Sequence, residues 1–246
     1  QLIKPQSLLC WQRVILANRL ASTSPQWASI FSLYNSGTYN NQFMALDLKQ
    51  LVPNEQVKEN TLVIAEQMPG KIAINDVSNV LAFGYWPSYN VPYDRSIQEY
   101  SGLLDSLQKH PETAVMMSYQ HCVRANIFRR DQTKVDSLEG MKKMIRYNDY
   151  QHDPLSLGNP GYAIASRNDL RENKKSCGGA YDAKVSSYSL IMKNPSDLPM
   201  QIINGPTYDQ QPAFQFDDQC GPYVSHLGMP QSYKFPWQSF TTADFE

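Results

Sequence analysis

No apolar run in the 246 residues approaches the roughly 20 consecutive residues that cross a bilayer as a helix. The sequence is also poor in charge: 18% of its residues are charged and the net charge is -1, whereas about 25% is usual. The mean hydropathy of -0.49 therefore reflects asparagine, glutamine, serine and tyrosine rather than ions. Neither a transmembrane span nor binding to nucleic acid or an anionic membrane surface is expected.

Familiar catalytic and metal-binding motifs are also missing. The sequence has no Gly-x-Ser-x-Gly elbow, phosphate-binding loop, dinucleotide fingerprint or His-Glu-x-x-His pair. Its four histidines are isolated, and its four cysteines form no Cys-x-x-Cys pair. We therefore expect no metal or other cofactor. Cys177 and Cys220 lie in glycine-containing loops where a disulfide would be useful, whereas Cys10 is predicted to be a buried free thiol.

The length allows one large domain or two small ones. The chain begins with Gln1 rather than Met and shows no signal-peptide pattern, so we expect a piece of a longer precursor, cut internally.

Residues 34–48 attract attention because a turn leads directly into an alternating strand. Gly37 and the neighbouring asparagines and serine suit the positive φ angles of tight turns. In the strand, Phe43, Ala45 and Asp47 should face one side of a sheet, and Met44, Leu46 and Leu48 the other. An amide-rich turn that leads into a core strand is a good place for a polar site, although a well-hydrogen-bonded turn alone explains the composition.

The remaining pattern predicts an α+β protein. The first helix, 7–20, should bury Leu8, Leu9, Trp11, Ile15, Leu16 and Leu20 and leave Arg13 outside. Further helices are expected from Ser24 as N-cap, over 95–109, and from Asp136 to about Arg146. Strands are expected at 43–48, 61–67, 71–74, 183–191, 201–204 and 213–216. The short links between the first three strands indicate an antiparallel meander.

Two polar residues are candidates for chemistry. Asn90 ends the aromatic, proline-bounded loop Tyr-Trp-Pro-Ser-Tyr-Asn at 85–90, and a rigid loop can direct an amide at a developing oxyanion. Arg124 could bind a carboxylate or phosphate through two parallel hydrogen bonds. From the residues alone, the plainer interpretations are a turn cap for Asn90 and a salt bridge for Arg124.

Longer motifs change this balance. They occur in one order over nearly the whole chain, at 34–42, 85–90, 127–132, 146–150, 152–156, 178–185, 205–207 and 228–230. Together they resemble the C-terminal half of the phospholipase B-like family, which includes the laminin-ancestor proteins. The resemblance implies an N-terminal-nucleophile (Ntn) hydrolase fold, an αββα sandwich of two antiparallel sheets, of which residues 1–246 supply about half of a single domain.

The resemblance also implies a function. Family members are cut internally, and the cut frees a cysteine that acts as nucleophile on a separate, upstream chain. Asn90 would donate to the oxyanion, and Arg124 would orient the nucleophile or bind substrate. The expected substrate is an amide or acyl ester such as a phospholipid, and the expected setting is a lysosomal or secreted homodimer. A catalytically silent binding or structural protein that keeps the fold is the alternative.

Overall fold

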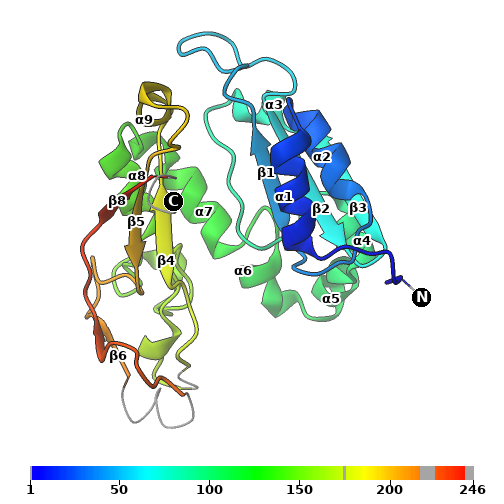
Figure 1. The fold of residues 1–246 in the computed structure, drawn as a ribbon. Coiled ribbons are helices and arrows are strands. Elements are labelled where there is room, and N and C mark those ends of the chain that lie inside the picture. Colours follow the sequence, from blue (N-terminus) through cyan, green and yellow to red (C-terminus); the bar gives the residue numbers. More distant parts are fainter. Residues whose placement is uncertain (1, 174–175, 217–224, 242–246) are drawn as a thin grey trace. The chain divides into compact units, whose positions relative to one another are not determined.

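The computed structural model describes residues 2–173, 176–216 and 225–241 and divides the chain into two compact units, Gln1–Cys122 and Val123–Glu246 (Figure 1). Helices and small sheets occur in both units, and the paired strands of every sheet are antiparallel. The α+β class is therefore confirmed. Within the described ranges, no helix has both the length and the apolar character to cross a membrane.

The first unit is built on the predicted meander. Strands β1 (Gln42–Leu46), β2 (Leu62–Met68) and β3 (Lys71–Asp76) pair in the order β1-β2-β3. The register places Gln42 opposite Glu66. The predicted strands thus agree with the structure to within two residues at each end.

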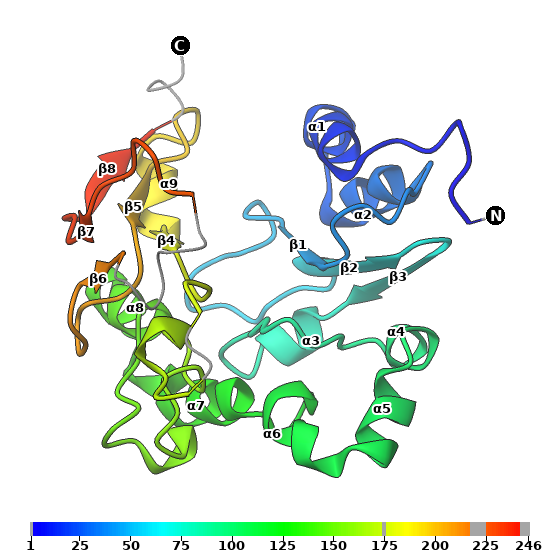
Figure 2. The same cartoon turned by 90° about the horizontal axis from the view of Figure 1, so that it is seen from below.

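Strand β2 is buried on both faces, because helices lie on either side of the sheet (Figure 2). Val63 and Ala65 pack against helices α1 (Cys10–Leu20) and α2 (Ser24–Ser32), together with Phe43 of β1. Leu62 and Ile64 face the opposite side, which carries helices α3 (Ser78–Leu81) and α4 (Arg95–Tyr100). Alternation along one strand thus forms two separate apolar cores.

The orientation predicted for the first helix is wrong. Arg13 is 1% exposed, whereas Trp11 and Leu20 are each 60% exposed. Leu9, Ile15 and Leu16 are exposed as well. Arg13 can be buried because its guanidinium group finds two backbone carbonyls and a glutamine side chain inside the unit. Cys10 is a buried free thiol, as predicted.

Two other helices differ from the prediction in detail. The predicted helix 95–109 is two helices, α4 and α5 (Leu103–Lys109), because Gly102 between them has a φ of 74°. The N-cap of α2 is Thr23 rather than Ser24, and its hydroxyl accepts a hydrogen bond from the amide of Gln26. The unit closes with a 3-10 turn, Pro111–Thr113, and helix α6 (Ala114–Met117).

The second unit contains helices α7 (Val123–Asp131) and α8 (Leu138–Ile145), and strand β4 (Asp182–Val185) lies beside α8. Ser137, not Asp136, caps α8. The predicted strand 183–191 is wrong beyond Val185, because Ser187 caps a further helix, α9 (Tyr188–Lys193). Strands β5 (Met200–Asn204) and β8 (Gln238–Phe240) complete the order β4-β5-β8.

A smaller pair, β6 (Phe214–Gln215) and β7 (Ser232–Tyr233), carries an aromatic cluster around Phe214 and Tyr233. The segment between α8 and β4 is loop-rich, as predicted, with short 3-10 turns at Pro154–Ser156 and Asn168–Leu170. Another 3-10 turn, Gln132–Lys134, follows α7 directly. Cys177 is disulfide-bonded, whereas its predicted partner Cys220 lies outside the described residues.

Candidate functional site

The turn before β1 is fixed by one asparagine. The Asn35 side chain donates hydrogen bonds to the carbonyls of Met68 (2.8 Å) and Lys71 (3.1 Å), and it accepts one from the amide of Gly37 (2.8 Å). Gly37 has a φ of 67°, which a residue with a Cβ adopts only at a cost. The amide-rich turn is therefore well hydrogen-bonded, as its composition suggested, and it is attached to the β2–β3 hairpin.

A carboxylate is buried beside this turn. Glu66 is 3% exposed and accepts three hydrogen bonds, from Gln42 Nε2 (2.8 Å) and from the backbone amides of Tyr93 (2.8 Å) and Asp94 (2.7 Å). Within residues 2–173, 176–216 and 225–241, no lysine, arginine or histidine forms an ion pair with it. Amide donors rather than a cation therefore compensate the charge.

The aromatic loop lies over this carboxylate. Trp86 donates its indole N–H to Oε1 of Gln42 at 3.0 Å, and its ring meets that of Tyr93 edge-on at 5.0 Å. Tyr89 is buried, and its hydroxyl donates to the carbonyl of Tyr119. Asn90 follows with a φ of 61° and an exposed side chain. The loop is irregular, as predicted, yet it is held by specific contacts.

Asn90 lines a pocket of about 110 Å³ within the first unit. The walls are Asn40, Asn41, Gln42, Glu66, Gln67, Met68, Ser88, Asn90, Val91, Pro92 and Ile97. Two regions singled out from the sequence, the amide-rich turn and the aromatic loop, thus meet at one pocket. Its volume falls below the 300–1,000 Å³ typical of drug-sized ligands, so it suits a small polar group rather than a long acyl chain.

Arg124 belongs to the other unit. It is the second residue of α7, half-buried, and belongs to the second unit, whereas Asn90 belongs to the first. The two predicted site residues are therefore not brought together within one unit.

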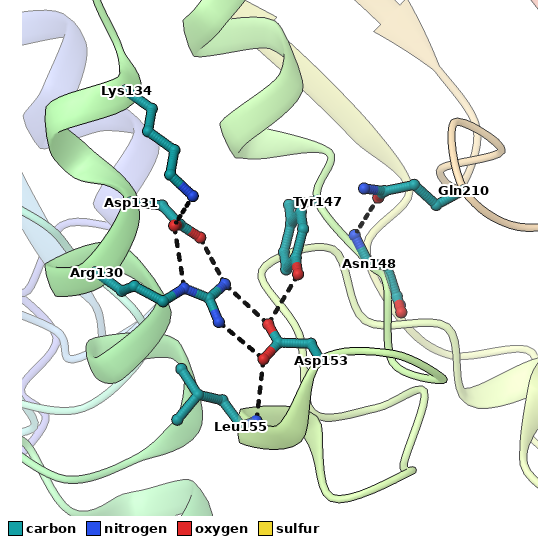
Figure 3. A network of polar contacts seen from close by, with 8 residues as sticks. All are labelled: Arg130, Asp131, Lys134, Tyr147, Asn148, Asp153, Leu155 and Gln210. Carbon is teal, nitrogen blue, oxygen red and sulfur yellow. Dashed lines mark hydrogen bonds and ion pairs between the residues drawn. The ribbon is translucent and has the colours of Figure 1, made fainter.

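The motif at 127–132 has a structural role in the second unit. Arg130 donates to both carboxylate oxygens of Asp153 at 2.8 and 2.9 Å and to Asp131 at 2.6 and 3.0 Å (Figure 3). Tyr147 donates its hydroxyl to Asp153 at 2.8 Å, and Lys134 pairs with Asp131 at 2.6 Å. Three of the family motifs, at 127–132, 146–150 and 152–156, thus converge on one polar cluster.

Ionisation follows from these contacts. Burial alone disfavours the charged form of Asp153, but hydrogen bonds from Arg130, Tyr147 and the amide of Leu155 outweigh it and lower the pKa of this carboxyl. Burial, together with the hydrogen bond to Asp153, raises the pKa of Tyr147 to about 12. The cluster is therefore an ionised carboxylate held by a cation and a neutral phenol, which is typical of a structural network.

Two further arginines hold loops together. Arg146 donates to the carbonyls of Gly205 (3.2 Å) and Pro206 (3.3 Å), and Arg167 to those of Thr207 (2.5 Å) and Pro212 (2.8 Å). Both arginines are almost fully buried. Asn148 is likewise buried; its side chain donates to the carbonyls of Pro160 and Ala165, and its backbone amide donates to Gln210 (Figure 3). Side-chain hydrogen bonds from Arg146 and Asn148 of the motif at 146–150, and from Arg167 outside the motifs, thus hold loops that have little regular secondary structure.

In the part of the chain that the structure describes, no group of three histidine, cysteine, aspartate or glutamate side chains lies close enough together to hold a metal ion. His152 instead contacts Asp149 at 2.7 Å on the surface, and His226 stacks on Phe216.

Sequence reasoning missed Glu66 and Gln42. The signal was present: in the strand Leu-Val-Ile-Ala-Glu-Gln-Met at 62–68, two polar residues follow four apolar ones without a turn residue between them. A carboxylate inside such a strand must find hydrogen-bond donors or remain in solvent. Its donors, however, come from residues 42, 93 and 94, which a single sequence does not place nearby.

Comparison with known proteins gives a consistent result. The sequence model of the family described as phospholipase B matches residues 1–240. Phospholipase B-like protein B of Dictyostelium discoideum is 42% identical over 248 residues, which cover 99% of this chain and 42% of that protein. Human phospholipase B-like 1 is 44% identical over 232 residues, 94% of this chain and 40% of that protein.

A similar match is found to a protein named phospholipase B from Crotalus adamanteus, which is 40% identical over 234 residues, 95% of this chain and 41% of that protein. The chain thus spans about two fifths of the length of these relatives.

Proposed function

Since the chain belongs to the phospholipase B-like family, we propose that it forms part of a hydrolase that cleaves an acyl ester or amide bond. Relatives named phospholipase B support a hydrolytic activity. The chain corresponds to about two fifths of each relative, and the activity is accordingly assigned to the longer protein that contains it.

The proposed nucleophile is the thiol of an N-terminal cysteine on a chain that comes from the upstream part of the same precursor. The α-amine of that cysteine takes the thiol proton, because its pKa of roughly 8 suits a base near neutral pH. The thiolate attacks the acyl carbon, and the carbonyl oxygen becomes an oxyanion. The alcohol or amine leaves with the proton, and water then hydrolyses the thioester.

In this mechanism, Asn90 donates its side-chain amide to the oxyanion. The observation that carries the assignment is the position of Asn90 at a positive φ, on a loop held at both ends, beside a small polar pocket. Arg124 orients the nucleophile or binds the polar end of the substrate. The long acyl chain lies outside this pocket, since about 110 Å³ holds only a small group.

Further chain is expected to cover parts of this one. Trp11 and Leu20 on α1 are 60% exposed, and Met44 and Leu46 on β1 are 52% and 48% exposed. Apolar side chains in such number on one helix and one edge strand support burial by a partner. The proposal therefore includes the Ntn αββα fold, completed by the upstream chain, in a lysosomal or secreted homodimer.

The test is to replace Asn90 in the full-length processed protein. Asn90→Gly keeps the left-handed backbone without strain and removes the amide, so the melting temperature should hold while kcat falls by roughly 10²–10³, with little change in KM. Asn90→Asp should be at least as damaging, because it places a negative charge where the oxyanion forms. Substrates would be a p-nitrophenyl ester and a p-nitroanilide of one fatty acid, and phosphatidylcholine vesicles.

Arg124→Ala tests whether Arg124 binds substrate, because the loss of a substrate contact raises KM as well. Full turnover in Asn90→Gly would overturn the oxyanion assignment. A partner chain that begins with a residue other than cysteine, serine or threonine would instead favour the catalytically silent protein.

A further inference from the structure

The loop that carries Asn90 is attached to the same carboxylate on both sides. On the C-terminal side, the backbone amides of Tyr93 and Asp94 donate directly to the two oxygens of Glu66. On the N-terminal side, Trp86 reaches Glu66 through the amide of Gln42. Residues 86–94 therefore form a span with both ends fixed to the centre of the sheet, and Asn90 lies near its middle.

The direction of every hydrogen bond in this network is determined by chemistry. The indole of Trp86 and the amides of Tyr93 and Asp94 can only donate. Gln42 must therefore present Oε1 to Trp86 and Nε2 to Glu66, which then accepts from all of its partners. A carboxylate at 66 and an amide at 42 satisfy this set. A carboxylate at 42 could still accept from Trp86, but it could not donate to Glu66.

The attachment is stiff because its base lies in regular structure. Gln42 and Glu66 are directly opposite each other on β1 and β2, and Glu66 is 3% exposed. The Trp86 ring packs on the core formed by Leu62 and Ile64. Both Gln42 and Glu66 also line the pocket beside Asn90, so the network reaches the place where the proposed oxyanion forms.

We propose that Glu66 and Gln42 are positioning residues that hold the Asn90 amide where the oxyanion develops. This inference rests on the proposed function, because it acts through Asn90. A donor displaced by about 1 Å can cost on the order of 10²-fold in rate. Loosening either attachment should therefore lower kcat and leave KM nearly unchanged, since neither residue is placed against the bulk of the substrate.

The decisive experiment is a double-mutant cycle in the full-length processed protein. Gln42→Met keeps the length of the side chain and removes both hydrogen bonds. It should lower kcat by at least about 10-fold in the wild-type background and by less than about 2-fold in the Asn90→Gly background, because a displaced donor matters only when the donor is present. Glu66→Gln should behave in the same way.

A matched control makes the same chemical change elsewhere. Gln201 lies on β5 and donates across the strands to Ser239, so Gln201→Met deletes a strand amide remote from the loop in sequence. Its kcat should stay within about 2-fold of wild type. Equal losses for Gln42→Met in the two backgrounds would overturn the positioning role.

A second measurement is independent of turnover. The indole N–H of Trp86 can be assigned by Trp86→Phe and followed by ¹⁵N NMR. Its signal should shift and its solvent exchange should quicken in Gln42→Met. An unchanged indole signal would overturn the network even if Asn90 is catalytic. Conversely, if Asn90→Gly keeps full turnover while the indole responds, the oxyanion role of Asn90 fails. The network then only holds the loop in place, and the positioning role fails with it.

Discussion

Arg13 donates a hydrogen bond of 2.6 Å from Nη2 to Oε1 of Gln67, although both side chains lie inside the first unit with at most 2% exposure. Gln67 in turn donates to the carbonyls of Thr38 and Tyr39. Helix α1, strand β2 and the turn before β1 are therefore joined by one buried polar chain. Buried polar groups that are fully satisfied in this way fix a unique arrangement of the elements around them.

Removing the guanidinium group of Arg13 should destabilise the fold. Arg13 also donates to the carbonyls of Phe31 (2.6 Å) and Leu8 (3.1 Å), so Arg13→Met leaves several buried acceptors without a donor. We expect a loss of about 3–5 kcal/mol in the free energy of unfolding, measured by urea denaturation of the full-length protein. Arg19→Met, on the exposed side of the same helix, should stay within about 0.5 kcal/mol. Equal effects of the two variants would contradict the buried role.

The polar cluster of Arg130, Asp131, Lys134, Tyr147 and Asp153 should make the stability of the protein depend on pH. The pKa of Asp153 is lowered in the folded state, whereas an unfolded aspartate titrates near 3.9. Its contribution to stability is therefore fully present above about pH 4 and is lost as the pH falls from there through the folded pKa. Denaturation midpoints measured from pH 7 to pH 2 should fall steeply below about pH 4.

Asp153→Asn should flatten that acid-side fall and lower stability at pH 7 by about 1–3 kcal/mol, a range discounted because Arg130 is partly exposed. Glu139→Gln offers a control, since the Glu139 carboxylate that pairs with Lys142 is 71% exposed. That variant should retain the wild-type pH profile. If the denaturation midpoints of Asp153→Asn parallel those of wild type down to pH 2, the cluster does not cause the loss of stability in acid.

The turn before β1 leaves no room for a side chain at Gly37. A Cβ there would lie 2.5 Å from the backbone N and Cα of Pro69, and the φ is 67°. Gly37→Ala should therefore cost about 2–5 kcal/mol, from left-handed strain plus a backbone displacement. Gly102→Ala carries the strain alone, since its φ is 74° and no heavy atom lies within 4 Å, and should cost about 1–2 kcal/mol. Thermal melts of both variants would show the difference.

Local patterns predicted the first unit's sheet well because strand alternation and turn residues act over short distances. The opposite faces of Phe43 and Met44, for example, follow directly from the period of two. The orientation of α1 could not be predicted in this way. The amphipathic pattern predicts that the arginine lies outside, and nothing local shows that Gln67, 54 residues away, will accept a hydrogen bond from it.

The candidate site was predicted only in part, again because local patterns do not show which distant segments come together. Asn90 and the turn at 34–42 were noticed because their residue types are unusual for their positions, and the structure brings both regions to one pocket. Glu66 was missed because its importance depends on three donors from distant segments. The long motifs that carry the family resemblance were found easily, yet much of what they encode in the second unit is the attachment of loops by Arg130 and Arg146.

Glu66 and Gln67 are neighbours on β2 that point to opposite faces, one towards the loop with Asn90 and the other towards Arg13. An insertion or deletion of one residue in this strand would exchange them. An insertion would bring the carboxylate to the guanidinium of Arg13, and a deletion would bring the amide to the backbone donors of the loop. Substitutions can be tested one at a time here, but the strand has no tolerance for a change in length, so over evolutionary time its spacing should be kept more strictly than its apolar residues.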